Sequence, residues 1–320
     1  MQGFDARFRD VQDYILTGTR EIWDDRGFRG GMADLYHPAI IHRDARGVAQ
    51  GAEAVAALGL AGLLAVPDRR LLGEDVIWCG SDRRGFLASH RMVALGRHTA
   101  PGPWGEPTGR ALRYRIVADR FAKANRISDE WQVVDTEAIF GQIGGDVKTW
   151  ARARLDRTDS PEPVFCPEFD VPGPYTGRGN DETWGLAFEL VLERLMAGQL
   201  SVVPEQYDAA CQLAYPGGRD VHGWREVERF WLGLRQAFPD AEFAVHHRIG
   251  LEEPMLPPRA ALRWSLTGRH DGWGLFGRPT GARVHVMGIS HVEFGPEGLR
   301  REWTLFDAAA IWMQILAEEG

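Results

Sequence analysis

Asp135 is a candidate for proton exchange with a bound molecule. Residues 126–136 have the composition of a strand. Because side chains on a strand alternate in direction, Trp131, Val133 and Asp135 share one face. If that face lines an apolar cavity, loss of solvation raises the pKa of the carboxyl group and makes it a usable acid or base. The alternative is a structural role, since Asp also favours helix N-caps and strand ends.

Two histidines that end Gly-Arg-His segments are the next candidates, His98 and His270. An imidazole titrates near neutral pH, so either ring can orient a substrate carbonyl or exchange a proton with a nearby aspartate. The alternative is a hydrogen-bonded histidine at a strand end that fixes the following loop.

The recurrence of this segment is part of an internal repeat, in which matched residues lie 172 positions apart. The matched segments are Pro67-Asp68 with Pro239-Asp240, Gly96-Arg97-His98 with Gly268-Arg269-His270, Pro107-Thr108-Gly109 with Pro279-Thr280-Gly281, Glu130-Trp131 with Glu302-Trp303, Asp135 with Asp307, and Gln142 with Gln314. An ungapped register of this length indicates a tandem duplication.

Each copy is predicted to place helices first and a sheet afterwards. Apolar residues at helical spacing predict an opening helix over residues 4–22 and another over 184–195. A second helix is expected over 52–65 and over 224–237, each ended by the Pro-Asp that follows. Strands are expected at 75–79, 85–95, 110–121 and 126–136, and the Gly-rich and Pro-rich separators suit an antiparallel meander.

A stretch rich in proline and glycine, residues 156–181, has the composition of a linker. We therefore expect one domain over residues 1–150, a linker over 151–182 and a second domain over 183–320.

The repeated motif resembles the SnoaL-like polyketide cyclases of the nuclear-transport-factor-2-like superfamily. It comprises His98 followed by Gly105-Glu106-Pro107-Thr108-Gly109-Arg110, then Ile127-Ser128-Asp129-Glu130-Trp131 with Asp135, and finally Gln142-Ile143-Gly144. The resemblance implies an α+β fold of two cones, each a curved antiparallel sheet wrapped by about three helices. Such cones hold small hydrophobic molecules in many relatives, and some relatives catalyse cyclisation, isomerisation, dehydration or epoxide hydrolysis.

The same resemblance implies roles for several acids. Asp135 and Asp307 match the acid/base aspartate of the polyketide cyclases. Asp119 matches an inward-pointing acid of related enzymes, where it would pair with Asp135 and raise one pKa. The second copy has His291 at the position of Asp119, so the two pockets have diverged. The alternative for Asp119 is a surface ion pair with a neighbouring arginine.

Further pocket candidates are less specific. His42 follows two isoleucines where relatives place a pocket residue. His42 and His37 have alanine counterparts in the second copy, Ala214 and Ala209, at the common offset. Five tryptophans could form flat apolar walls for a ligand or simply fill a core: Trp78, Trp104, Trp131, Trp273 and Trp303. No histidine spacing typical of a metal site occurs, and we expect no bound metal.

Composition limits the class of protein. The 320 residues are 44% apolar and 26% charged with a formal net charge of −8, and no basic block occurs, so nucleic acid is not an expected partner. No stretch approaches the length of a membrane span. The three cysteines are odd in number and widely spaced, which indicates a reducing compartment and predicts a cytoplasmic protein.

We therefore expect a cofactor-independent acid/base enzyme for a small, largely apolar molecule, of cyclase, isomerase, hydratase or hydrolase type. No dinucleotide-binding or phosphate-binding glycine motif occurs, and no cofactor is expected. The alternative is a protein of the same fold that binds a small molecule without chemistry. The two domains are expected to pack through their sheets as an intramolecular pseudo-dimer, with further homo-oligomerisation left open.

Overall fold

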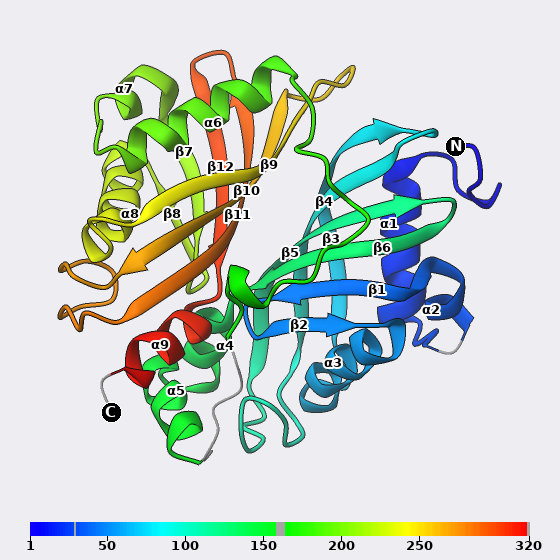
Figure 1. Cartoon of the computed structure of the whole chain (residues 1–320), viewed down its shortest axis with the longest axis horizontal. Helices are drawn as coiled ribbons and strands as arrows, with labels where there is room; N and C mark the ends of the chain where they lie inside the picture. The colour runs from blue at the N-terminus through cyan, green and yellow to red at the C-terminus, as the bar shows by residue number, and fades with distance from the viewer. Residues whose placement is uncertain (29, 158–163, 319–320) are drawn as a thin grey trace. The chain divides into compact units, whose positions relative to one another are not determined.

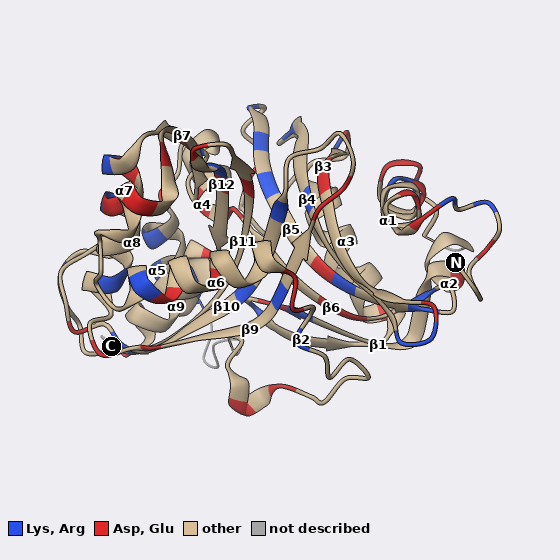
Figure 2. Cartoon of the chain, turned by 90° about the horizontal axis from the view of Figure 1, so that it is seen from above, with Lys and Arg blue, Asp and Glu red and all other residues tan. Residues whose placement is uncertain are grey.

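The computed structural model describes residues 1–28, 30–157 and 164–318, which form two compact units (Figure 1). The first unit comprises Met1–Gly145 and Phe165–Gly177, and the second comprises Asp146–Val164 and Arg178–Gly320. Each unit is an α+β domain built on one six-stranded sheet. Acidic and basic residues are spread along both units instead of forming one block (Figure 2).

The first unit opens with helices and closes with strands, as the apolar spacing predicts. Its elements are α1 (Val11–Thr19), the π-helix η1 (Arg20–Asp24), α2 (Gly30–Leu35), β1 (Tyr36–Asp44), β2 (Gly47–Gln50), α3 (Ala52–Ala65), β3 (Arg70–Ser81), β4 (Gly85–Arg97), β5 (Ala111–Lys123), β6 (Arg126–Val134), α4 (Thr136–Ile143) and the 3-10 helix η2 (Pro167–Phe169). Helix α1 begins later than predicted because Asp10 caps it, accepting a hydrogen bond from the backbone N–H of Asp13.

The second unit repeats this order. Its elements are α5 (Val147–Asp156), α6 (Thr183–Met196), α7 (Val202–Gln206), β7 (Tyr207–Tyr215), β8 (Arg219–His222), α8 (Trp224–Ala237), β9 (Glu242–Leu251), β10 (Arg259–Arg269), β11 (Arg283–Gly295), β12 (Gly298–Phe306) and α9 (Ala308–Ala317). The strand order is β2-β1-β6-β5-β4-β3 in the first sheet and β8-β7-β12-β11-β10-β9 in the second. The identical order confirms that the chain holds two copies of one fold.

The sheets differ from the prediction in one respect, because each is mixed and not wholly antiparallel. Strands β1 and β6 run parallel, and so do β7 and β12. The chain between β1 and β6 contains α3 and four strands, which is ample length for the crossover that a parallel pair requires. The remaining neighbours in both sheets are antiparallel, as expected.

Strand pairing also corrects the counterparts of the β1 histidines. His42 lies opposite Glu130 on β6, and Leu213 lies opposite Glu302 on β12, so the counterpart of His42 is Leu213 and not Ala214. The turn between β7 and β8 spans residues 216–218, whereas the turn between β1 and β2 spans only 45–46. The extra residue shifts the offset along this strand by one, and His37 corresponds to Asp208.

The predicted linker, residues 151–182, begins inside a helix. Asp146 caps α5, and Ala151 of this helix packs against Met313 and Leu316 of α9 in the second unit. Residues 165–177 belong to the first unit instead. Apolar positions on α5 therefore extend the second unit on its N-terminal side, and residues 158–163 of the predicted linker lie outside the described residues.

The core of the first unit lies between its helices and one face of the sheet. Side chains of α1, α2 and α3 pack there against alternate residues of the strands, among them Ile40, Val76, Ala88 and Ala122. We call this helix-covered side the inner face of the sheet.

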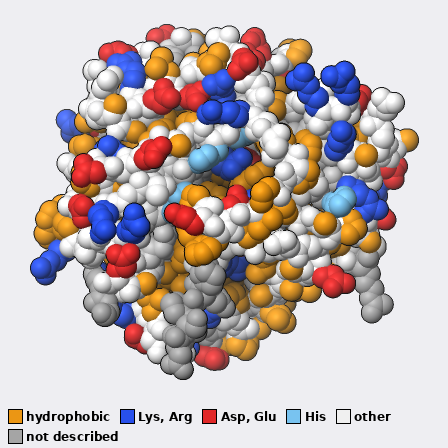
Figure 3. Space-filling view, in the orientation of Figure 1, with side chains coloured by type: hydrophobic (Ala, Val, Ile, Leu, Met, Phe, Trp, Pro, Cys, Tyr) orange, Lys and Arg blue, Asp and Glu red, His pale blue; other side chains and the backbone are white. Residues whose placement is uncertain are grey.

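On the surface shown in Figure 3, hydrophobic side chains are interspersed with charged ones.

Candidate functional site

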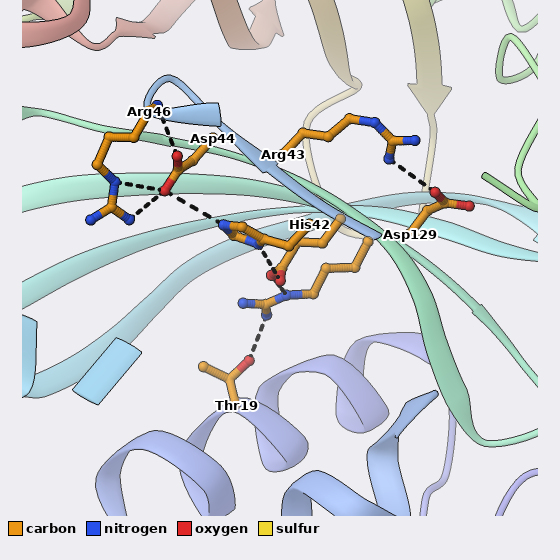
Figure 4. Close-up of polar contacts among 8 residues, drawn as sticks. Thr19, His42, Arg43, Asp44, Arg46 and Asp129 are labelled. Atoms are coloured by element: carbon orange, nitrogen blue, oxygen red, sulfur yellow. Dashed lines mark hydrogen bonds and ion pairs between the residues drawn. The ribbon is translucent and has the colours of Figure 1, made fainter. Parts of the chain in front are cut away.

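A network of charged and polar side chains is buried on the inner face of the first sheet (Figure 4). His42 comes from β1, Glu130 from β6, Arg120 from β5 and His90 from β4, and all four side chains are at most 4% exposed. Strand alternation aims these residues at the helices because each shares its face with buried apolar neighbours of the core. Thr19, at the end of α1, completes the network from the helix side.

Glu130 lies at the centre of the network. Its Oε2 is 3.0 Å from His42 Nδ1, and its Oε1 accepts a 2.6 Å hydrogen bond from Arg120 Nε. Arg120 Nη1 donates to Thr19 Oγ1 at 2.8 Å. His42 Nε2 is 3.6 Å from Asp44 Oδ2, so this imidazole lies between two carboxylates.

The charges hold one another in their ionised forms. Burial alone would lower the pKa of His42, but its hydrogen bonds to Asp44 and Glu130 and their negative charges raise it to about 9. Burial alone would raise the pKa of Glu130, but the Arg120 charge and the hydrogen bond with His42 lower it to about 2. The pKa of Asp44 is lowered as well, because His42 and Arg46 outweigh its burial. The network therefore consists of ion pairs at neutral pH.

A small cavity adjoins this network. Its volume is about 10 Å³, and its polar lining comes from Tyr14, Thr19, Tyr36 and Arg120. The remaining lining is apolar, from Ile15, Gly18, Ile22, Leu35 and Ile127. Such a volume accommodates about one water molecule. A larger ligand therefore requires side chains or helices to move. Ile22 of this wall belongs to the π-helix Arg20–Asp24, a conformation found frequently at functional sites.

The second unit keeps the glutamate but changes its surroundings. Glu302 accepts hydrogen bonds from Tyr207 Oη at 2.8 Å, Tyr215 Oη at 3.3 Å, Trp231 Nε1 at 3.1 Å and Thr304 Oγ1 at 2.7 Å. Burial raises the pKa of this carboxyl group, although the four hydrogen bonds oppose the effect. All four partners are neutral.

Strand register shows which residues correspond between the two networks. Arg120 lies opposite Glu130, and Val292 lies opposite Glu302. The other two counterparts are aliphatic as well: Leu213 replaces His42 and Leu262 replaces His90. The glutamate is thus common to both units, and its charged partners occur in the first unit alone among these aligned positions.

A comparison with protein families places the second unit. Residues 188–303 match the SnoaL-like domain. The match lies within the second unit. The first unit shares the strand order of the SnoaL-like domain, which agrees with the tandem arrangement. A comparison with curated proteins finds no match. Within the described residues, no helix is long and apolar enough to cross a membrane.

Several solved structures are similar to parts of the chain. AclR of Streptomyces galilaeus, a proposed hydroxylase, is 17% identical with a TM-score of 0.36, and the match covers 42% of this chain and 94% of AclR. IdmH of Streptomyces antibioticus, a proposed polyketide cyclase, is 21% identical with a TM-score of 0.36, covering 42% and 97%. A proposed SnoaL-like polyketide cyclase of Jannaschia sp. CCS1 is 19% identical with a TM-score of 0.36, covering 43% and 97%.

The structure gives Asp135 and Asp307 capping roles. Asp135 Oδ1 accepts a hydrogen bond from the Ala138 N–H at the start of α4, and Asp307 Oδ1 accepts from the Ala310 N–H at the start of α9. The face that Trp131 occupies is not the one covered by the helices, because Glu130 points toward them. Trp131 instead lies under the Arg43 guanidinium, 4.5 Å from the ring centroid. An acid/base role for the two aspartates stays a prediction.

Asp119 and His291 lie on the same side of their sheets as the tryptophans. Asp119 is opposite Trp131 in the β5–β6 pair, and His291 is opposite Trp303 in the β11–β12 pair. Both side chains are buried. Because Arg120 is the inward neighbour of Asp119, this aspartate is directed away from the buried network.

His98 and His270 make loop contacts of the kind that the structural alternative describes, and a catalytic role for them stays a prediction. His98 Nδ1 is 3.3 Å from Thr108 Oγ1, and His270 Nδ1 is 3.1 Å from Thr280 Oγ1. Burial lowers the pKa of His98. The same bond in both units explains why Gly-Arg-His and Pro-Thr-Gly recur together.

The other predicted pocket residues separate into groups. His42 belongs to the buried network, and its predicted role in ligand binding stays a prediction. Trp78 and Trp104 pack at the edges of apolar core clusters. Trp131 and Trp303 lie on the opposite face from the glutamates, and Trp273 is 69% exposed. A ligand-binding role for these tryptophans stays a prediction.

Glu130, Arg120 and His90 were missed by the sequence reasoning. One signal for Glu130 was present in the repeat. The glutamate recurs together with the tryptophan in the pair Glu130-Trp131, but only the tryptophan was interpreted as a pocket residue. Arg120 carried a second signal: its counterpart in the repeat is a valine, so a charge is confined to one copy.

Proposed function

We propose that the chain is a cofactor-independent acid/base enzyme acting on a small, largely apolar molecule, with its working site in the first unit. The observation that carries this proposal is the contrast between the two units at the same sheet positions. His42, Arg120 and His90 surround Glu130, whereas aliphatic side chains take these three positions around Glu302.

The contrast matters because a buried ionic network is a poor way to stabilise a fold. Removing several charges from water costs free energy that the ion pairs recover only in part, and apolar replacements are often as stable. The SnoaL-like domain forms the same sheet without these charges. Strongly shifted ionisable groups held in one place are also typical of catalytic sites, so we assign the network a chemical role.

His42 is the proposed proton-exchange group. It lies between Glu130 and Asp44, and its raised pKa of about 9 keeps the ring protonated at neutral pH. In this state the imidazolium can donate a proton to a substrate carbonyl oxygen while water or hydroxide takes the proton from the adjacent carbon. The neighbouring carboxylates compensate the charge of the imidazolium and fix its orientation. The carboxylates themselves are weak bases because their pKa values are lowered.

Arg120 is the proposed electrostatic group. Its guanidinium lines the cavity together with the hydroxyl-bearing side chains Tyr14, Thr19 and Tyr36. Fixed donors of this kind stabilise negative charge that develops on a substrate oxygen, most strongly where water is excluded. The apolar part of the lining suits a substrate with a hydrocarbon skeleton.

Ligand binding without chemistry is the second candidate, and it applies to the SnoaL-like domain. Glu302 there has four neutral hydrogen-bond donors and aliphatic residues in place of the histidines and arginine. A group in such surroundings can bind a ligand but has no cationic partner to stabilise a developing negative charge.

A cytoplasmic location remains part of the proposal. Cys79, Cys166 and Cys211 are free thiols, and Cys79 and Cys211 are buried. Free thiols of this kind are typical of a reducing compartment.

The test is proton exchange with solvent, which needs no knowledge of the final product. Small ketones, esters and nitroalkanes are incubated in D₂O with the wild-type protein, and exchange at the acidic C–H is followed by proton NMR. His42→Leu introduces the residue found in the second unit, and Glu302→Gln is the matched control. We expect wild-type exchange above the buffer rate, a loss of roughly 100-fold in His42→Leu, and little change in Glu302→Gln.

Two results would contradict the proposal. One is exchange by His42→Leu at the wild-type rate while circular dichroism shows an intact fold. The other is exchange no faster than in buffer for every compound of the panel.

A further inference from the structure

His90 has one ring nitrogen that the network does not use. The side chain is 1% exposed, and its Nδ1 is 3.3 Å from Arg120 Nη1. A guanidinium only donates, so Nδ1 accepts, and the neutral ring must carry its proton on Nε2. The ring is neutral because burial and the charges of Arg120 and Arg91 lower its pKa well below the usual value. Within the described ranges, Nε2 has no hydrogen-bond partner.

A buried donor of this kind calls for an explanation, because nearly all buried polar groups form hydrogen bonds. The surroundings of Nε2 offer one. A Cβ built on Gly73 would lie 3.1 Å from Nε2 and would collide with Leu16 of α1. Gly73 itself is exposed, and Leu16 is 41% exposed. The His90 N–H therefore lies close beneath the surface where α1 crosses the edge strand β3.

In the second unit, larger apolar side chains fill the positions that correspond to Gly73 and His90. Gly73 pairs with Met92, and Val245 pairs with Trp264 at the equivalent point of the second sheet. The second unit therefore has valine where the first has Gly73, and Leu262 where the first has His90. The fold therefore requires neither a glycine at position 73 nor an imidazole at position 90.

We infer that His90 Nε2 donates a hydrogen bond to the carbonyl oxygen of an uncharged ligand, which reaches it between α1 and β3 by displacing Leu16. This inference rests on the proposed function and names the substrate class of that site. A carbonyl fits because it accepts and does not donate. A carboxylate fits poorly, because the cations of the network are already compensated by Glu130 and Asp44.

The test compares two probes of the same shape, acetophenone and ethylbenzene, by ligand-observed NMR. The wild-type protein should bind acetophenone roughly tenfold more tightly than ethylbenzene, the value of one hydrogen bond to a buried donor. His90→Leu should bind the two probes equally. Gly73→Val, which copies the second unit, should weaken both, and Leu16→Ala should not weaken either.

A measurement on the wild-type protein guards against a variant that fails to fold. Nitrogen-15 spectra should show the His90 ring as the Nε2-protonated tautomer, and acetophenone but not ethylbenzene should shift the Nε2 signal. Equal affinities in the wild type, a ketone preference that survives in His90→Leu, an unshifted Nε2 signal or no binding of either probe would overturn the inference.

The same probe separates this inference from the proposed function. If acetophenone binds in preference but its methyl hydrogens exchange with D₂O no faster than in buffer, His90 recognises a carbonyl and the acid/base proposal loses its support. If exchange occurs in the panel of carbon acids without a ketone preference at His90, the acid/base proposal stands and the inference fails.

Discussion

The His42 ion pairs should make the stability of the first unit depend on pH in a window set by this one side chain. The pKa of His42 is about 9 in the folded protein, against 6.5 for an ordinary histidine. A raised folded-state pKa stabilises the fold fully below pH 6.5, and this stabilisation is lost as the pH rises through about 9. At 1.36 kcal/mol per pKa unit, the loss is about 3 kcal/mol.

The measurement is urea unfolding of wild-type protein and His42→Leu at several pH values between 6 and 10. The chain has two units, so each unfolding transition is fitted separately. The wild type should lose about 3 kcal/mol more than His42→Leu over this range. Taking the difference removes other groups that titrate in the same direction, such as Glu302, whose raised pKa also favours lower pH.

An exposed histidine on β8 provides the control, because His222→Gln should leave the pH dependence unchanged. If wild type and His42→Leu lost stability in parallel up to pH 10, His42 would not be a charged member of the network. The assignment of His42 as a proton donor at neutral pH would then be wrong as well.

Three further outcomes are expected. Glu130→Gln should cost about 3–5 kcal/mol in urea unfolding because it leaves buried cations without their partner, whereas Glu302→Gln should cost about 1 kcal/mol because neutral hydroxyl groups can reorient; equal costs would show that the first network is not ionic. Asp135→Ala should cost about 1 kcal/mol through loss of the α4 cap, and a variant as stable as wild type would remove that capping role. Iodoacetamide at pH 8 should label the partly exposed Cys166 at least about tenfold faster than Cys79, as read by peptide mass spectrometry, because burial and the charge of Asp119 raise the pKa of the Cys79 thiol to about 12; comparable rates would mean that Cys79 is accessible.

Much of the fold follows from the sequence because the repeat supplies two independent readings of each element. The helices predicted over residues 52–65 and 224–237 match α3 and α8. Their ends are set by the Pro-Asp that follows each one, a local signal that tertiary structure does not override. The parallel pairing of β1 with β6 was not predictable in this way, because no local pattern records which distant strand becomes a neighbour.

Which face of the sheet the helices cover could not be predicted from the sequence, for a physical reason. Alternation shows that Trp131 and Asp135 share a face, but it cannot show which face the helices cover. The usual rule places the tryptophan inside and the glutamate outside. The structure reverses it, because Glu130 is compensated by Arg120 and His42, and Trp131 packs against Arg43 and Tyr175. These partners lie far apart in sequence, so the burial of Glu130 becomes evident only once the strands are paired.

The extra residue in the turn over residues 216–218 has an evolutionary consequence. Because the length change lies in a turn, β7 and β8 keep their pairing and β7 keeps its register with β12. A gene duplication followed by a single-codon insertion or deletion at this turn leaves both sheets intact while the residues facing the two glutamates diverge. A sequence alignment at a constant offset pairs His42 with Ala214 and overlooks that divergence. Ancestral reconstructions of such tandem proteins should therefore align the strands on either side of this turn independently.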